Sequence, residues 1–225
     1  MNATWIDTLG RLRGGARAWA LGSRPGNHLI DIGTAELRVR DVGPGDAPAF
    51  LFAADAPVGI EHYDALLSRW PAHLRAVVLE MPGFGFSTPR SGFDFTLGAY
   101  AETAVSAMEL LECQQPTLVF ACAWGFVALE AVRRAPGLIQ RLILPQTPSW
   151  EDMVRWTARV DRRAIFRRPL IGQALMKAAP KRIARLWFRN AYPDRAFGAS
   201  LSGVSDEALD HGGRFSLASL MQGLT

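Results

Sequence analysis

The sequence predicts an α/β fold with a mostly parallel, doubly wound sheet, followed by a helical region. Short apolar runs of the kind that form buried strands alternate with longer segments of helical periodicity, which is typical of βαβ units. Such units place parallel strands side by side and cover both faces of the sheet with helices. After Gln146 the chain becomes helical and basic as far as about Ala191. We expect these last helices to lie over the carboxyl ends of the strands, where open α/β sheets bind ligands.

The elements are expected in the following order. Alternation between His28 and Val42, broken at Gly33, favours two short strands in a hairpin, and a Gly-Pro turn follows at residues 43–48. Four apolar runs predict further strands, over Ala49–Ala53, Arg75–Leu79, Thr117–Ala121 and Leu142–Leu144. Helical periodicity predicts helices over Ile60–Trp70, Leu97–Leu111, Trp124–Arg134 and Val204–Thr225.

The composition bounds the class of protein. With 225 residues, of which 49% are hydrophobic and 20% charged, the chain is expected to form one well-buried domain. We divide it into an N-terminal helix (1–24), an α/β core (25–147) and a helical cap or lid region (148–225). No apolar run approaches the roughly 18 residues needed to cross a bilayer, and residues 1–23 lack the continuous apolar stretch of a signal peptide. Two cysteines fit a reducing compartment, so we expect a cytoplasmic protein without a membrane span.

Positive charge is concentrated in the helical region. Residues 151–195 contain twelve Lys or Arg against four Asp or Glu. This is the pattern of a surface that attracts an anionic substrate or an acidic partner, or of the solvated faces of amphipathic helices. No nucleic-acid-binding motif accompanies it, and the four histidines are not spaced as metal ligands. We therefore expect a small-molecule ligand, and no nucleic acid, metal or cofactor.

One loop links the sequence to a known family. Residues Glu80-Met-Pro-Gly-Phe-Gly-Phe-Ser87 resemble the acidic-x-Pro-Gly-x-Gly-x-Ser loop of the α/β-hydrolase superfamily, in the cap-bearing branch of haloalkane dehalogenases, epoxide hydrolases and proline iminopeptidases. A second similarity lies downstream, where Cys122 is 14 residues before Pro136 and the strand-like Arg141–Leu144 follows. The resemblance implies an α/β-hydrolase fold with a helical cap. The chain ends before the last strands of that fold are expected.

In this superfamily a sharp turn between a strand and a helix exposes a nucleophile. In one register of the resemblance, Cys122 holds that position. Phe120 and Trp124 then stand where the family has glycines, which leave room at the strained turn. The gap-free match that extends to Pro136 favours this register.

A register shifted by one residue satisfies the steric requirement instead. It places Ala121 and Gly125 at the small positions, and Ala123, which has no reactive group, at the position of the nucleophile. A third interpretation is that Cys122 is an inert core residue, because free cysteines are among the most buried residues.

A catalytic Cys122 must be a thiolate, and the first turn of the following helix favours that negative charge. In the family a histidine base and an acid complete the site, but neither is found at a matching position. His211 lies in a segment expected to be helical, and Glu151 is merely the nearest carboxylate after the Leu142–Leu144 strand.

The oxyanion position also departs from the family, which has His-Gly where this chain has Ala54-Asp55. The N–H of Ala56 is a candidate donor to an oxyanion, but the carboxylate of Asp55 beside it opposes negative charge there. Asp55 is expected to be a helix N-cap, or else a repurposed acid or nucleophile. The pocket residues expected beside Cys122 are Asp55, Ala56, Ala123 and Trp124.

Two hypotheses about function follow. The first is a hydrolase of a small hydrophobic ester, acyl compound or related substrate, with Cys122 as the nucleophile. The second is a catalytically inactive member of the fold that binds a ligand or a partner protein. The sheet is expected to have an exposed edge, so a homo-oligomer that pairs through this edge is also expected.

Overall fold

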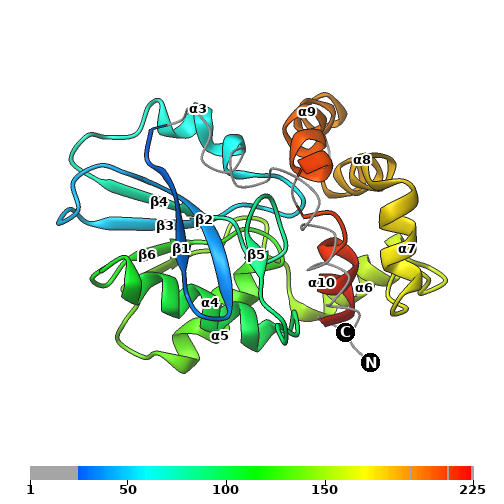
Figure 1. The fold of residues 1–225 in the computed structure, drawn as a ribbon, viewed down its shortest axis with the longest axis horizontal. Coiled ribbons are helices and arrows are strands. Elements are labelled where there is room, and N and C mark those ends of the chain that lie inside the picture. Colours follow the sequence, from blue (N-terminus) through cyan, green and yellow to red (C-terminus); the bar gives the residue numbers. More distant parts are fainter. Residues whose placement is uncertain (1–24, 193, 212, 224–225) are drawn as a thin grey trace.

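The computed structural model describes residues 25–223 except 193 and 212, and shows a sheet covered by helices with a separate group of helices at one end (Figure 1). The expected N-terminal helix over residues 1–24 lies outside the described residues. The strands are β1 (Asn27–Asp31), β2 (Ala35–Val42), β3 (Ala49–Ala53), β4 (Arg75–Leu79), β5 (Thr88–Pro89), β6 (Thr117–Val119) and β7 (Arg141–Ile143). The helices are η1 (Ile60–Tyr63), α3 (Asp64–Leu67), α4 (Leu97–Leu110), α5 (Trp124–Arg134), α6 (Trp150–Val160), α7 (Ile171–Ala178), α8 (Pro180–Ala191), α9 (Arg195–His211) and α10 (Ser216–Gly223).

The sheet has the strand order β1-β2-β4-β3-β6-β7, and β5 pairs with β2. Strands β4, β3, β6 and β7 are parallel, whereas β1, β2 and β5 pair in the antiparallel sense. The hairpin predicted between His28 and Val42 accounts for part of the antiparallel half. The central strands are parallel because helices connect them, and the predicted fold class is confirmed.

Alternate side chains of the central strands enter two hydrophobic cores, which is what a sheet covered on both faces requires. Phe52 and Val78 pack with Ile60 and Leu67 on the side of η1 and α3. The larger core, on the other side, contains side chains from β3, β4 and β6 together with residues of α4 and α5. In Figure 1 the helix α3 lies above the sheet, and α4 and α5 lie below it.

Two predicted helices differ in extent from the structure. The segment Ile60–Trp70 forms only a short 3₁₀ turn and one turn of α-helix, which ends at Leu67, because Pro71 disfavours helical backbone at the residue before it. The segment expected to be helical from Val204 forms the end of α9 and all of α10, with a break between them. At this break the N–H of Gly213 donates a hydrogen bond to the carbonyl of Gly85, 2.6 Å away.

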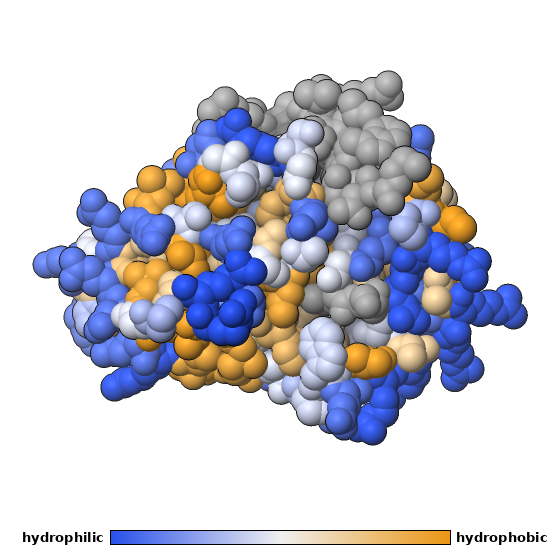
Figure 2. Space-filling model, turned by 90° about the horizontal axis from the view of Figure 1, so that it is seen from below, coloured by the Kyte–Doolittle hydropathy of each residue, from blue (hydrophilic) through white to orange (hydrophobic). Residues whose placement is uncertain are grey.

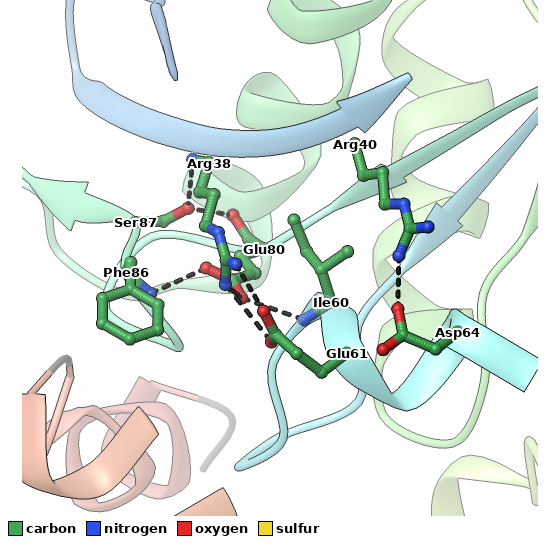
Figure 3. Close-up of polar contacts among 8 residues, drawn as sticks. All are labelled: Arg38, Arg40, Ile60, Glu61, Asp64, Glu80, Phe86 and Ser87. Carbon is green, nitrogen blue, oxygen red and sulfur yellow. Dashed lines mark hydrogen bonds and ion pairs between the residues drawn. The ribbon is translucent and has the colours of Figure 1, made fainter. Parts of the chain in front are cut away.

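The loop over Glu80–Ser87 is held by a buried ion-pair network (Figure 3). Arg38 on β2 is 1% exposed and pairs with Glu80, which is fully buried, at 3.0 Å, and also with Glu61. The Glu80 carboxylate accepts hydrogen bonds from the N–H groups of Ile60 (2.9 Å) and Phe86 (2.7 Å). One carboxylate therefore joins the loop to β2 and to the start of η1.

Gly85 is required at its position in this loop. Its φ is +50°, and a Cβ atom there would lie 2.2 Å from the carboxyl carbon of Glu80. A larger residue would therefore collide with the group that organises the loop. This is the physical reason for the second glycine of the Pro-Gly-Phe-Gly motif.

Exposed apolar residues occur on the helices under the sheet and on its last strand, among other places. The underside, formed by α4 and α5, shows orange hydrophobic residues among blue hydrophilic ones (Figure 2), and Leu110, Leu129 and Val132 are exposed there. Among the described strands, β7 pairs only with β6, and its Ile143 is exposed. Association through this edge stays a prediction.

Within the described part of the chain, each helix is too short or too polar to cross a bilayer.

Candidate functional site

A sharp turn connects β6 to α5 and carries Cys122. The backbone of Cys122 has φ +53°, in the left-handed region that residues with a Cβ atom rarely adopt, whereas Ala123 has φ −61° and forms the N-cap of α5. The N–H of Cys122 donates to the carbonyl of Pro145 at 2.9 Å, which ties the turn to the end of β7. The strained position therefore belongs to Cys122 and not to Ala123.

Gly125 satisfies the steric requirement one turn further along. A Cβ atom at Gly125 would lie 2.1 Å from Oγ1 of Thr147. The Thr147 hydroxyl also donates to the carbonyl of Cys122 at 3.3 Å. The turn thus combines features of both registers: Cys122 has the strained backbone, and Gly125 provides the close contact with the segment after β7.

Trp124 lies in the hydrophobic core, although we expected it beside the pocket. It is 1% exposed, and its ring packs edge-on against Tyr100 and Phe84, with centroid distances of 4.9 and 5.6 Å. Its Nε1–H donates to the carbonyl of Ala54 at 2.9 Å. Trp124 therefore fixes the backbone at the end of β3, immediately before Asp55.

A pocket opens between the Cys122 turn and the helices that follow β7. The space open to the centre of a water molecule is about 40 Å³, and the empty volume counted out to solvent is about 530 Å³. Cys122 and Ala123 contribute the side nearest the sheet. The remaining lining residues come from the C-terminal helices and the loop after α6: Trp150, Met153, Val154, Trp156, Thr157, Arg167, Trp187, Leu220 and Met221. Cys122 and Ala123 line the pocket as expected, whereas Asp55, Ala56 and Trp124, which we also expected there, are not among its lining residues. Sequence reasoning did not identify Arg167 or the residues of α10.

Asp55 lies just beyond β3 and contacts a residue from the helical region. The hydroxyl of Tyr192, which follows α8, donates to the Asp55 carboxylate at 3.4 Å. Burial raises the pKa of Asp55 to about 7, although hydrogen bonds from the Ala56 N–H and the Tyr192 hydroxyl act in the opposite direction. This carboxyl group is therefore poised to gain or lose a proton near neutral pH.

One expectation for this segment is wrong and one stays a prediction. Asp55 is not the N-cap of the helix that follows, since Gly59 holds that position and η1 has no side-chain cap. The N–H of Ala56 lowers the pKa of Asp55 through its interaction with the carboxyl group, and its role as an oxyanion donor stays a prediction. Local sequence could not show these contacts, because they depend on how the chain folds back after β3.

The Cys122 thiol is protonated at neutral pH. Burial raises its pKa to about 12, the charge of Asp55 acts in the same direction, and a hydrogen bond from the Ala123 N–H opposes them. A thiol with this pKa is ionised in only about one molecule in 10⁵ at pH 7. A helix N-terminus is expected to lower the pKa of a thiol. Here desolvation and the charge of Asp55 raise the pKa by more than the helix lowers it.

The side chain of His211, the histidine nearest the C-terminus, lies outside what the structure describes. Among His28, His62 and His73, whose side chains are described, none has a hydrogen bond to Cys122 or Asp55. His62 instead packs against the rings of Tyr63 and Phe197, and burial lowers its pKa. No group of three or more potential metal ligands occurs among the residues that the structure describes. Charge links the thiol to Asp55 and Tyr192: Asp55 raises the pKa of Cys122, and burial together with the charges of Asp55 and Cys122 raises the pKa of Tyr192.

We expect Asp55→Asn to raise the midpoint of thermal unfolding at pH 8, by roughly 3–8 °C. At this pH the wild-type chain must bury a charged carboxylate on folding, and the amide does not. Because the pKa of Asp55 is raised on folding, the folded chain takes up a proton at a higher pH than the unfolded chain does. The wild-type protein therefore gains stability as the pH falls. The difference in unfolding midpoint between Asp55→Asn and the wild type shrinks towards pH 4. Thermal unfolding followed by circular dichroism at both pH values measures this. Asp46→Asn, at an exposed position, is the control. If the midpoint of Asp55→Asn exceeds that of the wild type by the same amount at both pH values, the raised pKa of Asp55 is contradicted.

Comparisons with known proteins support the fold. No family model and no curated protein matches the sequence. A Pseudomonas aeruginosa protein described as a candidate epoxide hydrolase superposes with a TM-score of 0.74 at 14% identity, over 91% of this chain and 71% of its own. A structure of epoxide hydrolases of the α/β-hydrolase superfamily, from metagenomes of hot environments, gives 0.72 at 17% identity, over 89% and 70%. The epoxide hydrolase of Bacillus megaterium gives 0.67 at 15% identity, over 87% and 71%.

The sheet, the Cys122 turn and these superpositions together define an α/β-hydrolase fold. At such low identity the similarity establishes the fold alone, and the nature of the site must be argued from its own residues. The expectation drawn from the Glu80–Ser87 loop is thereby confirmed at the level of the fold.

Proposed function

We propose that this chain binds a small, mainly apolar ester or acyl compound in the pocket at the Cys122 turn and hydrolyses it slowly through Cys122. The observation that carries the proposal is the position of this thiol: it sits on a strained turn and lines a pocket whose other walls are mostly apolar. Apolar pockets with a few polar groups are the usual binding sites for small molecules. The helices α6–α8 act as the cap that shields the bound molecule from water.

Asp55 accepts the proton of the thiol in this proposal. The ionised carboxylate takes the proton from Cys122 as the sulfur attacks the carbonyl carbon, and a C–S bond forms. The C–O bond of the ester breaks, and the leaving alkoxide takes the proton from Asp55 and departs as an alcohol. Asp55 then takes a proton from water as the hydroxide attacks the thioester, the C–S bond breaks, and the proton returns to the sulfur.

The rate is expected to be low for two reasons. The pKa of Cys122 lies well above that of Asp55, so the proton transfer is uphill. The N–H groups of Ala56 and Ala123, which are candidate donors to an oxyanion, are engaged with the Asp55 carboxyl group and the Cys122 sulfur. Loss of one oxyanion donor typically reduces kcat by about 10²–10³-fold.

The test compares hydrolysis of p-nitrophenyl butyrate by the wild-type chain, Cys122→Ala and Cys113→Ala. We expect Cys122→Ala to reduce turnover to the background rate. Cys113→Ala serves as the control, because Cys113 is buried in the core and does not line the pocket; we expect it to keep the wild-type rate. Trapping of a butyryl group on Cys122, seen by mass spectrometry, would support the covalent step. Equal turnover in both variants would contradict it.

A second function, binding without turnover, is favoured by the high pKa of the thiol. In that case butyrate esters or their amide analogues bind the wild-type chain and Cys122→Ala equally, and neither protein hydrolyses the ester above background. Turnover of the ester above background separates the two functions, and calorimetric titration with the non-hydrolysable butyramide shows independently whether the pocket is occupied.

A further inference from the structure

The pocket at the Cys122 turn is apolar except at one place. Among the described residues that line it, Arg167 is the charged one. It lies in the loop between α6 and α7, and its side chain is 25% exposed. A cation in an apolar wall is unfavourable unless a partner compensates it, so the partners of this guanidinium decide what the wall can bind.

Asp161 holds the loop but does not satisfy the guanidinium. One oxygen of its carboxylate accepts from the N–H groups of Ile165 (2.9 Å) and Phe166 (3.2 Å), and the other accepts from the N–H of Arg167 (3.1 Å). The contact between this second oxygen and Nε of Arg167 is 3.5 Å long. Asp161 therefore uses its hydrogen bonds mainly to cap the loop backbone.

Asp161 contacts one donor of Arg167. The buried Nε has no hydrogen bond of normal length, and it lies 3.5 Å from the Asp161 carboxylate in an ion pair. A guanidinium has five N–H donors in a planar fork, which a carboxylate can accept in pairs. Because Asp161 faces the fork only through Nε, a carboxylate bound in the pocket can pair with the terminal N–H donors.

We infer that Arg167 binds the carboxylate of an amphipathic ligand whose apolar part fills the pocket towards Cys122. This rests on the proposed function, because it takes the pocket as the binding site, and it narrows the substrate class to esters or acyl compounds that also carry a carboxylate. The guanidinium disfavours a cationic ligand. The other arginines of the helical region add a positive potential that draws an anion towards the pocket.

The test uses two probes of the same shape, 4-phenylbutyrate and its neutral amide, in calorimetric titrations. We expect the wild-type chain to bind the carboxylate roughly tenfold or more tightly than the amide, which is the effect of a charged hydrogen-bonded pair. Arg167→Met is expected to abolish this preference, so that it binds the carboxylate and the amide with equal affinity. Arg167→Lys, which keeps the charge without the planar fork, is expected to keep part of the preference and covers the case in which Arg167→Met does not fold.

Arg163→Met is the matched control, because Arg163 is exposed on the same loop, does not line the pocket, and its loss changes the net charge equally. We expect it to keep the preference. Equal affinities of the wild-type chain for the two probes would overturn the role of Arg167 while leaving the pocket as a binding site. If Arg163→Met and Arg167→Met lose the preference for the carboxylate to the same extent, the direct role of Arg167 is also overturned, since long-range charge would then explain the preference. Failure of both probes to bind would overturn the proposed pocket together with the inference.

Discussion

Replacing Arg38 with methionine is expected to destabilise the fold by about 3–5 kcal/mol, the usual effect of removing one partner of a buried ion pair. The substitution leaves the fully buried Glu80 facing Glu61 without a cation. Burial already raises the pKa of Glu80, and the charge of Arg38 opposes this rise. Without Arg38 the pKa of Glu80 rises further, so the loss of stability is greater at pH 8, where folding must bury the charge, than at pH 5. Urea unfolding at both pH values measures the free energy.

Arg40 offers a matched control on the same strand. It pairs with Asp64, whose side chain is 42% exposed, and Figure 3 shows this pair beside the Arg38 network. A pair with one partner in solvent is worth about 0–1 kcal/mol, so Arg40→Met should have a small effect. If Arg38→Met is no more destabilising than Arg40→Met, the network does not organise the loop as we describe.

Alkylation of Cys122 by iodoacetamide is expected to be roughly 10³-fold slower in the folded chain than in the unfolded chain at pH 8. The thiolate is the reactive form, and a thiol with a pKa of about 12 is ionised to about one part in 10⁴ at this pH, against roughly a quarter for a free cysteine. The rate should rise about tenfold per pH unit as far as the fold survives. Mass spectrometry of the peptide that contains Cys122, sampled over time in buffer and in urea, gives both rates.

Two comparisons make this result specific. Cys113 is buried and its pKa is raised by burial, so it should react no faster than Cys122, which lines the pocket. Asp55→Asn removes the charge that raises the pKa of Cys122, so it should accelerate alkylation of Cys122 and leave Cys113 unchanged. A rate for Cys122 at pH 7 that approaches the unfolded rate would show an activated thiolate and would contradict the pKa assigned here.

Much of the scaffold could be predicted because it depends on local patterns. The apolar runs at Ala49–Ala53 and Arg75–Leu79 become the two central parallel strands, and the helix predicted over Trp124–Arg134 has the same limits in the structure. The glycines of the Glu80–Ser87 loop marked a special backbone, and the contact between Gly85 and Glu80 gives the reason. Periodicity and turn chemistry act over a few residues, so they can be recognised without the fold.

The site could be predicted only in part. The sequence pointed to Cys122 and left two registers open, and the structure combines the strained backbone of Cys122 with the close contact at Gly125. Its reactivity could not be predicted, because the pKa depends on desolvation and on the charge of Asp55, which is 67 residues away in the chain. Tyr192 gave no local signal, since its contact with Asp55 forms only when the region after α8 folds over the sheet.

The sequence by itself determined the order of strands and helices, the buried faces of the sheet, and the turn that carries Cys122. Those features follow from side-chain polarity and backbone preference over short stretches. Only the tertiary structure decided that the thiol is protonated, that Asp55 has a pKa near neutrality, and that Arg167 supplies the charge of an apolar pocket. These properties depend on which groups exclude water from one another, and that is set by contacts between residues far apart in the chain.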